Sequence, residues 1–220
     1  MKPYFEDGAV TIYHGDARQV IRQIALSEID VTVTDPPFGI EGGRGGGNSV
    51  RGKGHYVGAW DDTGENVEDL VALVVRPLIG TVGRMVLTPG RSHLWAYPKP
   101  DDMGCFWTPS AVGHGSWGHN SMTPILYYGK DPRAGRQTPT GRQVTEQSDR
   151  NGHPCPKPIK AWTWLVNKAS LEGETILDPF MGSGTTLRAA KDLGRKAIGI
   201  EIEERYCEIA AKRMAQGVLL

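Results

Sequence analysis

The sequence predicts an α/β domain in which a mostly parallel sheet carries helices on both faces. The main observation is that strand-like and helix-like segments alternate along almost the whole chain, most clearly near its carboxyl end. Such alternation is typical of parallel sheets, because each crossover helix brings the chain back to the same end of the sheet. A chain of 220 residues fits one domain, 1–220, and can bury a sizeable core without disulfides or metals.

Strands are expected where β-branched and apolar residues cluster, and helices where apolar residues recur every three or four positions. We expect strands at 10–13, 31–34, 84–87, 104–108, 122–128, 175–178 and 196–200. We expect helices at 17–26, 65–79, 158–170, 184–193 and 203–215. Every residue of 31–34 is β-branched, which is typical of a strand buried on both faces. Pro158 suits the first turn of a helix, and Gly194 suits the end of one.

Composition and charge exclude several classes of protein. Twenty-five Lys and Arg balance 25 Asp and Glu, so the chain is no polycation that coats nucleic acid, although a local basic face stays compatible with a neutral total. The longest apolar run, 70–75, is too short to cross a bilayer, and the N-terminal residues lack the core of a signal peptide. We therefore expect a cytoplasmic protein without a membrane partner. The cysteines form no C-x-x-C pair and the histidines lack metal-binding spacing, so we expect no metal.

Two segments interrupt the alternation. The first is a glycine-rich loop at 39–60, in which nine of the twenty residues from Gly39 to Gly58 are glycine. The second, 130–152, is polar and poor in apolar residues, and the stretch 130–160 holds seven Lys and Arg against three acids. Long loops inside a compact domain are usually functional or disordered. We expect the first segment to be mobile, while the simplest interpretation of the second is a solvated loop.

A glycine turn near the carboxyl end predicts a nucleoside site. The segment 175–186 reads as strand, turn and helix, and its Gly182 and Gly184 let the backbone approach a ligand where a Cβ would collide. The helix that begins near Thr185 directs free N–H groups and a positive dipole end at that ligand. Glu201 ends the next strand, where an acid can accept hydrogen bonds from ribose hydroxyls. The alternative is an ordinary helix start with a surface acid.

The turn fits a single nucleoside better than a dinucleotide. Leu187 stands where the dinucleotide fingerprint has its third glycine, and only 36 residues follow Gly184. That leaves room for one more strand and helix, which is too little for the rest of a dinucleotide-binding fold. S-adenosylmethionine is therefore a better candidate than NAD.

A second motif, Asp35-Pro36-Pro37-Phe38, follows the buried strand at 31–34. The prolines stiffen the turn and lack N–H groups, so the Asp35 carboxylate and the free carbonyls offer only acceptors. Their natural partner is an NH₂ group, and Phe38 adds a flat face on which a base can stack. Such a tetrapeptide alone is more often an ordinary loop. Its presence beside the glycine turn and Glu201 favours a pocket for an amino-bearing base.

Together these motifs resemble the DNA amino-methyltransferases, which methylate adenine N6 or cytosine N4. The order, with D-P-P-[YF] before F-x-G-x-G, is that of their β-type circular permutation. The segment 153–158 resembles their H-P-x-x-K-P element, and His14-Gly15-Asp16 resembles their early G-D element. Ile198-Gly199-Ile200-Glu201 matches their ribose-binding acid. The middle of the chain, 60–150, matches only loosely, and Thr34 replaces an apolar residue often found before the Asp.

The resemblance implies a single Rossmann-like methyltransferase domain over 1–220, with a mostly parallel seven-stranded sheet, that uses S-adenosylmethionine and acts on DNA. It leaves room for a homodimer and implies no metal. The implied catalytic residues are Asp35, Pro36, Pro37 and Phe38. The implied cofactor contacts are Asp16, Lys157, Asp178, Phe180, Gly182, Gly184, Thr185 and Glu201.

The resemblance also implies a mechanism. Hydrogen bonds from an exocyclic amine to the Asp35 carboxylate and the Pro36 carbonyl would turn its lone pair toward the methyl donor, without a nucleophilic Ser or Cys. The base must first leave the duplex, with Phe38 replacing its lost stacking. The loop 39–60 would cover the base, and 130–152 would form a short target-recognition region, which indicates a short or loosely read site or help from a second subunit.

Relatives that modify cytosine N4 often carry Ser in place of Asp35, which favours adenine N6 as the target here. The alternatives are a cytosine N4 enzyme, an RNA or protein amide methyltransferase, and a non-catalytic nucleic-acid-binding module. The protein-glutamine enzymes carry a motif like N-P-P-Y, and most RNA enzymes lack the permuted order. Every position expected for the chemistry is filled, which argues against the non-catalytic module.

Overall fold

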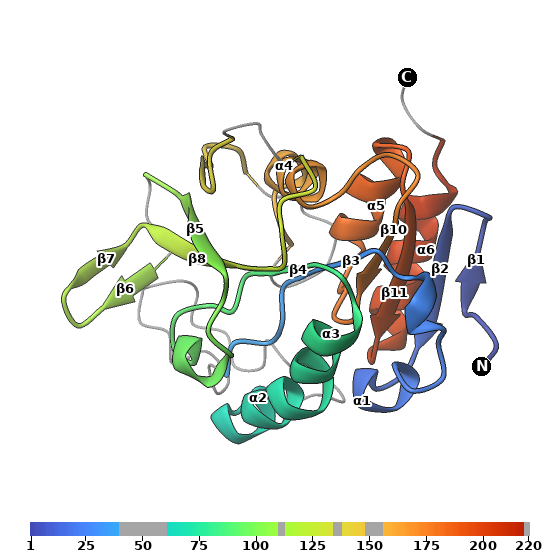
Figure 1. The fold of residues 1–220 in the computed structure, drawn as a ribbon, viewed down its shortest axis with the longest axis horizontal. Coiled ribbons are helices and arrows are strands. Elements are labelled where there is room, and N and C mark those ends of the chain that lie inside the picture. Colours follow the sequence, from blue (N-terminus) through green and yellow to red (C-terminus); the bar gives the residue numbers. More distant parts are fainter. Residues whose placement is uncertain (40–60, 110–112, 134–137, 148–155, 218–220) are drawn as a thin grey trace.

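The computed structural model describes residues 1–39, 61–109, 113–133, 138–147 and 156–217, which form one large sheet with helices on both faces (Figure 1). The strands run in the order β1-β2-β11-β10-β3-β4-β8-β5-β9. Their bounds are β1 (Phe5–Glu6), β2 (Val10–His14), β3 (Val31–Thr34), β4 (Met85–Leu87), β5 (Asp102–Trp107), β8 (Met122–Tyr128), β9 (Arg142–Gln143), β10 (Thr175–Asp178) and β11 (Lys196–Glu201). A separate hairpin consists of β6 (Gly113–Gly115) and β7 (Gly118–Asn120).

The centre of the sheet is parallel, as the sequence predicts. Strands β2, β11, β10, β3 and β4 all run the same way, whereas β8 is antiparallel to β4 and to β5. The described sheet has nine strands rather than the expected seven, because two-residue strands, β1 and β9, pair at its two edges. Two residues are too few to show an alternating pattern, so the sequence gives no signal for either strand.

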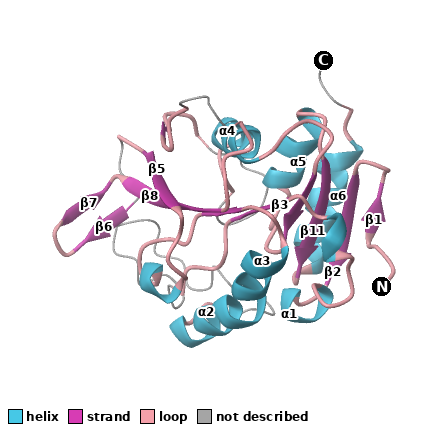
Figure 2. Cartoon of the chain, in the orientation of Figure 1, coloured by secondary structure: helices cyan, strands magenta, loops and turns pink. Residues whose placement is uncertain are grey.

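The helices cover the sheet in two layers (Figure 2). Helices α4 (Ile159–Ala169), α5 (Thr185–Asp192) and α6 (Glu204–Ala215) share one apolar cluster with β2, β3 and β10. Helices α1 (Ala17–Val20), α2 (Gly64–Leu70) and α3 (Arg76–Thr81) share the other. Val86 faces the first cluster, while Met85 and Leu87 face the second. The sheet is therefore buried on both faces, as expected for a parallel α/β fold.

Two helices differ from their expected lengths. The helix expected at 17–26 ends at Val20, and a short 3₁₀ turn follows at Leu26–Glu28. The helix expected at 65–79 is built from α2, a π-helical turn at Val71–Val75, and α3. Pro77 explains the interruption, because it has no N–H to donate and its ring displaces the preceding carbonyls. None of the helices in the described ranges is long and apolar enough to cross a membrane.

Candidate active site

One pocket opens at the carboxyl ends of β2, β3, β10 and β11. Because these four strands are parallel and adjacent, the residues that follow them meet at one edge of the sheet. The pocket is lined by most of the predicted site residues, and Gly184 alone among them does not line it. Those that do are Asp16, Asp35, Pro36, Pro37, Phe38, Lys157, Asp178, Phe180, Gly182, Thr185 and Glu201. Asp35 and Glu201, which are far apart in the sequence, thus share one cavity.

Glu201 at the end of β11 anchors the glycine turn. Its carboxylate accepts hydrogen bonds from the backbone N–H of Gly182 at 2.9 Å and of Glu203 at 2.9 Å. Burial raises the pKa of the Glu201 carboxyl to about 7, although the two N–H donors lower it, and the negative charges of Glu203 and Asp178 add a smaller rise. The acid is therefore held by the backbone at the pocket wall and titrates near neutral pH.

The two glycines of the turn have different tasks. Both adopt left-handed backbone angles, with φ of +52° at Gly182 and +76° at Gly184. A Cβ at Gly184 would lie 2.9 Å from the Cβ of Ala210 on α6. Gly184 therefore permits close packing of α5 against α6. The sequence predicts that it lets the backbone approach a ligand, but Gly184 does not line the pocket. Gly182 is the glycine that lines the pocket.

Asp178 at the end of β10 is a buried junction between the two motifs. Its carboxylate accepts hydrogen bonds from the Thr34 hydroxyl at 2.6 Å, the Phe180 N–H at 3.1 Å and the Thr186 hydroxyl. The Trp162 indole in turn donates to Thr186 at 3.0 Å. Burial outweighs these donors and raises the pKa of Asp178 to about 6. Thr34, which departs from the family pattern, thus has a partner across the sheet.

Asp16 lines the pocket and caps α1. Its carboxylate accepts a bond from the Arg18 backbone N–H at 2.9 Å and forms an ion pair with the Arg18 guanidinium at 2.5 Å. These bonds hold the pKa of Asp16 below its usual range. The carboxylate is therefore ionised and already oriented before any ligand binds.

Asp35 is held from both sides. The Thr88 hydroxyl donates to its Oδ1, and the Lys157 ammonium pairs with its Oδ2. The same ammonium lies 5.1 Å from the centre of the Phe38 ring. Lys157, which is expected to contact the cofactor, makes these two contacts with the D-P-P-F turn.

The sequence did not single out several residues of this region, among them Thr88, Asp62 and Gly90. Thr88 follows β4 just as Asp35 follows β3, and β3 and β4 are neighbouring parallel strands. Its place as the first polar residue after β4 could therefore have identified it from the sequence. Asp62 lines the pocket and accepts a hydrogen bond from the Gly39 N–H at 2.7 Å, for which the sequence offers no signal. Gly90 lies against Phe38, since a Cβ there would stand 2.8 Å from the ring.

The lining of the pocket is suited to a nucleoside. Phe180, Met181 and Tyr206 supply apolar walls, and Glu201 supplies acceptors at a strand end. Apolar walls with a few convergent polar groups are typical of cofactor sites. Within the described ranges, no three His, Cys, Asp or Glu side chains group as metal ligands would.

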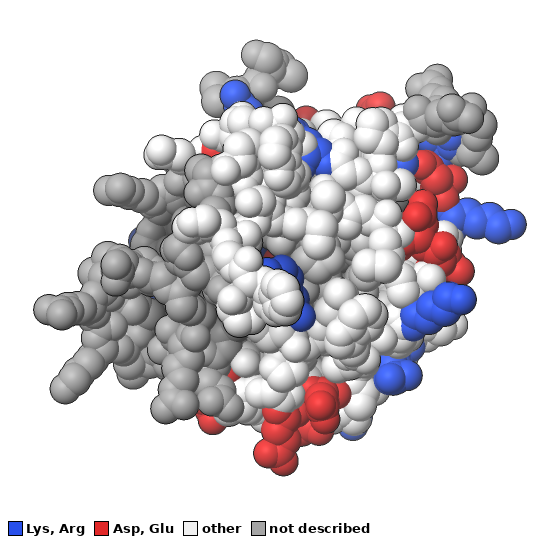
Figure 3. Space-filling view, turned by 90° about the vertical axis from the view of Figure 1, so that its left-hand side faces the viewer, with Lys and Arg blue, Asp and Glu red and all other residues white. Residues whose placement is uncertain are grey.

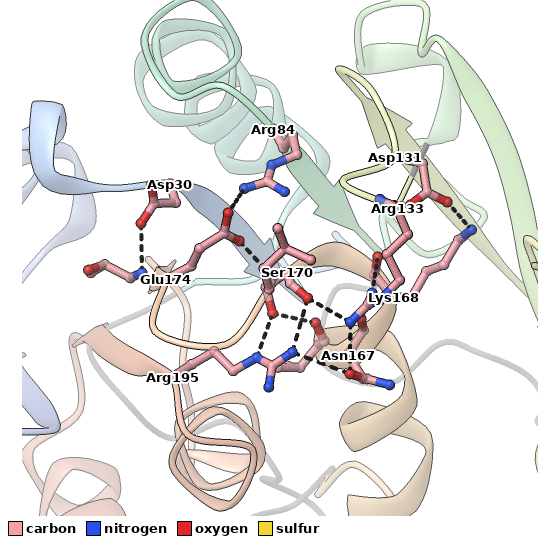
Figure 4. A network of polar contacts seen from close by, with 12 residues as sticks. Asp30, Arg84, Asp131, Arg133, Asn167, Lys168, Ser170, Glu174 and Arg195 are labelled. Atoms are coloured by element: carbon pink, nitrogen blue, oxygen red, sulfur yellow. Dashed lines mark hydrogen bonds and ion pairs between the residues drawn. The ribbon is translucent and has the colours of Figure 1, made fainter. Parts of the chain in front are cut away.

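The loop 40–60 and the residues 148–155, including His153 of the H-P-x-x-K-P element, lie outside the described residues. Of the predicted target-recognition region, 130–133 and 138–147 are described, and Arg133 binds carbonyls at the end of α4 (Figure 4). Lys168 on that helix pairs with Asp131 at 2.5 Å. Arg142 donates to the Lys160 carbonyl at 2.7 Å. These arginines are thus bound to the protein itself.

Comparison with known proteins gives one family match. Residues 84–212 match the model of the N6/N4 methyltransferase family, described as DNA methylase. Among curated proteins, the type II methyltransferase M2.LlaDCHI of Lactococcus lactis subsp. cremoris is 28% identical over 98% of this chain and 93% of its own length. The type II methyltransferase M.ScaI of Streptomyces caespitosus is 26% identical over 97% of this chain and 84% of its own.

Solved structures show the same fold. The PvuII DNA methyltransferase, described as cytosine-N4-specific, superposes with a TM-score of 0.73 at 16% identity, over 100% of this chain and 91% of that one. The M1.HpyAVI–SAM complex superposes with a TM-score of 0.67 at 21% identity, over 94% of this chain and 100% of that one.

Proposed function

This chain belongs to the N6/N4 family of DNA methylases, and we propose that it transfers a methyl group from S-adenosylmethionine to the exocyclic amine of a base flipped out of DNA. The observation that carries this proposal is the shared cavity, in which the Asp35 turn and the Glu201 turn face one space. Methyl transfer needs the acceptor and donor in line, and one cavity with two different walls meets that need.

The Glu201 wall binds the cofactor in this proposal. The cofactor supplies an electrophilic methyl group when bound. Glu201 would accept hydrogen bonds from its ribose hydroxyls, and Asp16 and Phe180 would hold its adenosine. The backbone N–H of Gly182 holds Glu201 at 2.9 Å, so this acid needs no rearrangement to bind. Lys157 is assigned to the opposite wall because it contacts Asp35 and Phe38.

The Asp35 wall binds the target base. The Asp35 carboxylate and the Pro36 carbonyl accept the two hydrogens of the amine, and Phe38 stacks on the ring. The Thr88 hydroxyl fixes the carboxylate through Oδ1, so the acceptors are oriented before the base arrives. Lys157 also lies where it must yield to the incoming amine, since it occupies one Asp35 oxygen and faces the Phe38 ring.

We further propose adenine N6 as the target atom, because the acceptor turn carries Asp35 rather than Ser. We also propose, from the order of the motifs, that the chain is of the β-type permutation. A cytoplasmic location, a homodimer, and a short or loosely read recognition site stay predictions. Single-molecule sequencing of DNA from expressing cells tests the last of these, and one long, strictly modified motif would contradict it.

The test of this function is transfer of labelled methyl from S-adenosylmethionine to unmodified DNA, followed by digestion to nucleosides and mass analysis. We expect N6-methyladenine as the product and no transfer with Asp35→Ala. N4-methylcytosine would overturn the choice of base alone. Labelling of RNA or protein instead of DNA, or no labelling of any substrate, would overturn the function.

A further inference from the structure

The antiparallel pair β5–β8 extends beyond the edge of the sheet at which the pocket opens. Leu126 of β8 pairs with Leu87, the last residue of β4, so β8 residues 122–125 lie past the ends of β3 and β4. At about 3.4 Å per residue, this extension is roughly 14 Å long. Trp107 pairs with Met122 at its far end, and the Thr108 N–H donates to the Ser121 carbonyl at 2.7 Å.

The hairpin β6–β7 continues from this extension and projects from the body of the molecule (Figure 1). Gly115 pairs with Gly118, so Ser116 and Trp117 form a two-residue turn. Trp117 is fully exposed, at 102% of its reference area. Two-residue hairpin turns favour Gly, Asn and Asp, and a tryptophan adds nothing to the turn itself.

The hairpin is tied to the acceptor wall of the pocket. The Arg91 guanidinium donates to the Asn120 side chain on β7. Arg91 follows Gly90, whose backbone lies against the Phe38 ring. A continuous chain of contacts therefore joins the hairpin to the aromatic side chain that is proposed to stack on the target base.

The described part of the surface on this side of the molecule carries few charged side chains. Figure 3 shows that much of the described surface there is uncharged, with one group of Lys or Arg atoms near its centre and the other charged side chains mostly toward its margins. The described arginines of the expected recognition region, Arg133 and Arg142, are bound to the protein itself. Aromatic side chains stack on bases of any sequence, whereas phosphate contacts need cations.

We propose that the β6–β7 hairpin contacts the DNA duplex and that Trp117 stacks on the bases exposed when the target base leaves the helix. This inference rests on the proposed function, because a duplex that delivers a base to Asp35 must approach the edge from which the hairpin projects. When one base leaves the helix, its neighbours lose the stacking contacts that they made with it. An aromatic side chain in its place restores part of that stacking.

The experiment compares Trp117→Ala and Trp117→Phe on two duplexes of one sequence. In the first the target base is paired, and in the second it lies opposite an abasic site, where leaving the helix costs little. We expect Trp117→Ala to lower kcat/KM roughly 10- to 100-fold on the paired duplex. The loss on the abasic duplex stays below about threefold, because extrusion there breaks no base pair and the extruded state needs less stabilisation. Trp117→Phe keeps most of the activity, since it retains an aromatic face.

Trp95→Ala is the matched control, because Trp95 is also exposed, at 90%, but lies outside the hairpin. We expect it to match the unmodified chain on both duplexes. Equal losses in the two alanine variants, equal losses on both duplexes, or no loss with Trp117→Ala would each overturn the inference. If the unmodified chain fails on both duplexes, the proposed function itself fails, and the two failures are thereby distinguished.

Discussion

The Thr34 hydroxyl donates a 2.6 Å hydrogen bond to the Asp178 carboxylate and so joins the strand that precedes the D-P-P-F turn to the strand that precedes the glycine turn. Both side chains are buried, with exposures of 0% and 2%. Thr34 ends β3 and Asp178 ends β10, which are neighbours in the sheet. The bond therefore fixes the relative position of the two turns that form the pocket walls.

Thr34→Val should destabilise the fold, and more at pH 8 than at pH 5. The pKa of Asp178 is raised to about 6, so the carboxyl favours folding while it is protonated and this contribution is lost as pH rises through 6. Above that pH the ionised carboxylate needs its donors, and losing one costs about 1.5–3 kcal/mol. Urea unfolding at the two pH values measures the difference.

Thr32→Val is the matched control for this variant. Thr32 lies on the same strand and is fully buried, but its hydroxyl has no hydrogen-bond partner among the described residues. Replacing it with a methyl group should leave the free energy of unfolding unchanged or raise it. Equal destabilisation by the two variants would show that the Asp178 bond is not the cause.

The affinity for S-adenosylmethionine should fall on acidification. Burial raises the pKa of Glu201 to about 7, and a protonated carboxyl has lost one of the acceptors that ribose hydroxyls need. Binding at pH 6 should therefore be roughly tenfold weaker than at pH 8. Calorimetric titration of the unmodified chain and of Glu201→Gln measures this. A weaker but pH-independent affinity is expected for the variant, and a flat profile for the unmodified chain would contradict the assignment.

Thr88→Val should lower the rate of methyl transfer without changing cofactor affinity. The Thr88 hydroxyl donates to Asp35, and without it the carboxylate can turn away from the target amine. We expect kcat to fall roughly tenfold, the loss typical of one hydrogen bond to a charged group. Thr88→Ser retains the hydroxyl and should restore the rate. A parallel loss of cofactor binding would indicate a purely structural role.

Gly184→Ala should destabilise the fold more than Gly173→Ala. Both glycines are left-handed, with φ of +76° and +80°. A Cβ at Gly184 meets Ala210 at 2.9 Å, whereas one at Gly173 meets no described atom within 4 Å. Gly173→Ala therefore measures the backbone cost alone, about 1 kcal/mol. The contact with α6 should add about 1–3 kcal/mol for Gly184→Ala, measured by urea unfolding. Equal losses would show that the packing imposes no constraint.

The sequence predicts the parallel centre of the sheet and the helices around it, because these elements carry long and regular patterns. Most of the site residues that it predicts line the pocket, since Asp16, Asp35, Asp178 and Glu201 each stand at or just after the end of a parallel strand. Parallel strand ends meet at one edge, so position along the chain is enough to bring such residues together.

Other features depend on contacts that no local pattern records. The pairing of Lys157 with Asp35 joins residues from a helix start and a strand end. The hairpin β6–β7 consists largely of glycine and polar residues, so neither of its strands shows the alternation that predicts a strand. The packing of Gly184 against Ala210 depends on where α6 lies, which the glycine turn itself cannot reveal.

The central claim is that one cavity has an acceptor wall at Asp35 and a cofactor wall at Glu201. The most direct measurement compares Asp35→Asn and Glu201→Gln by cofactor calorimetry and by single-turnover methyl transfer at saturating S-adenosylmethionine. Asp35→Asn keeps the shape but can turn an NH₂ group toward the amine, so it should bind the cofactor normally and transfer methyl at least roughly 100-fold more slowly. Glu201→Gln should bind weakly and still transfer once saturated. Normal transfer by Asp35→Asn, or loss of cofactor binding in both variants alike, would contradict the claim.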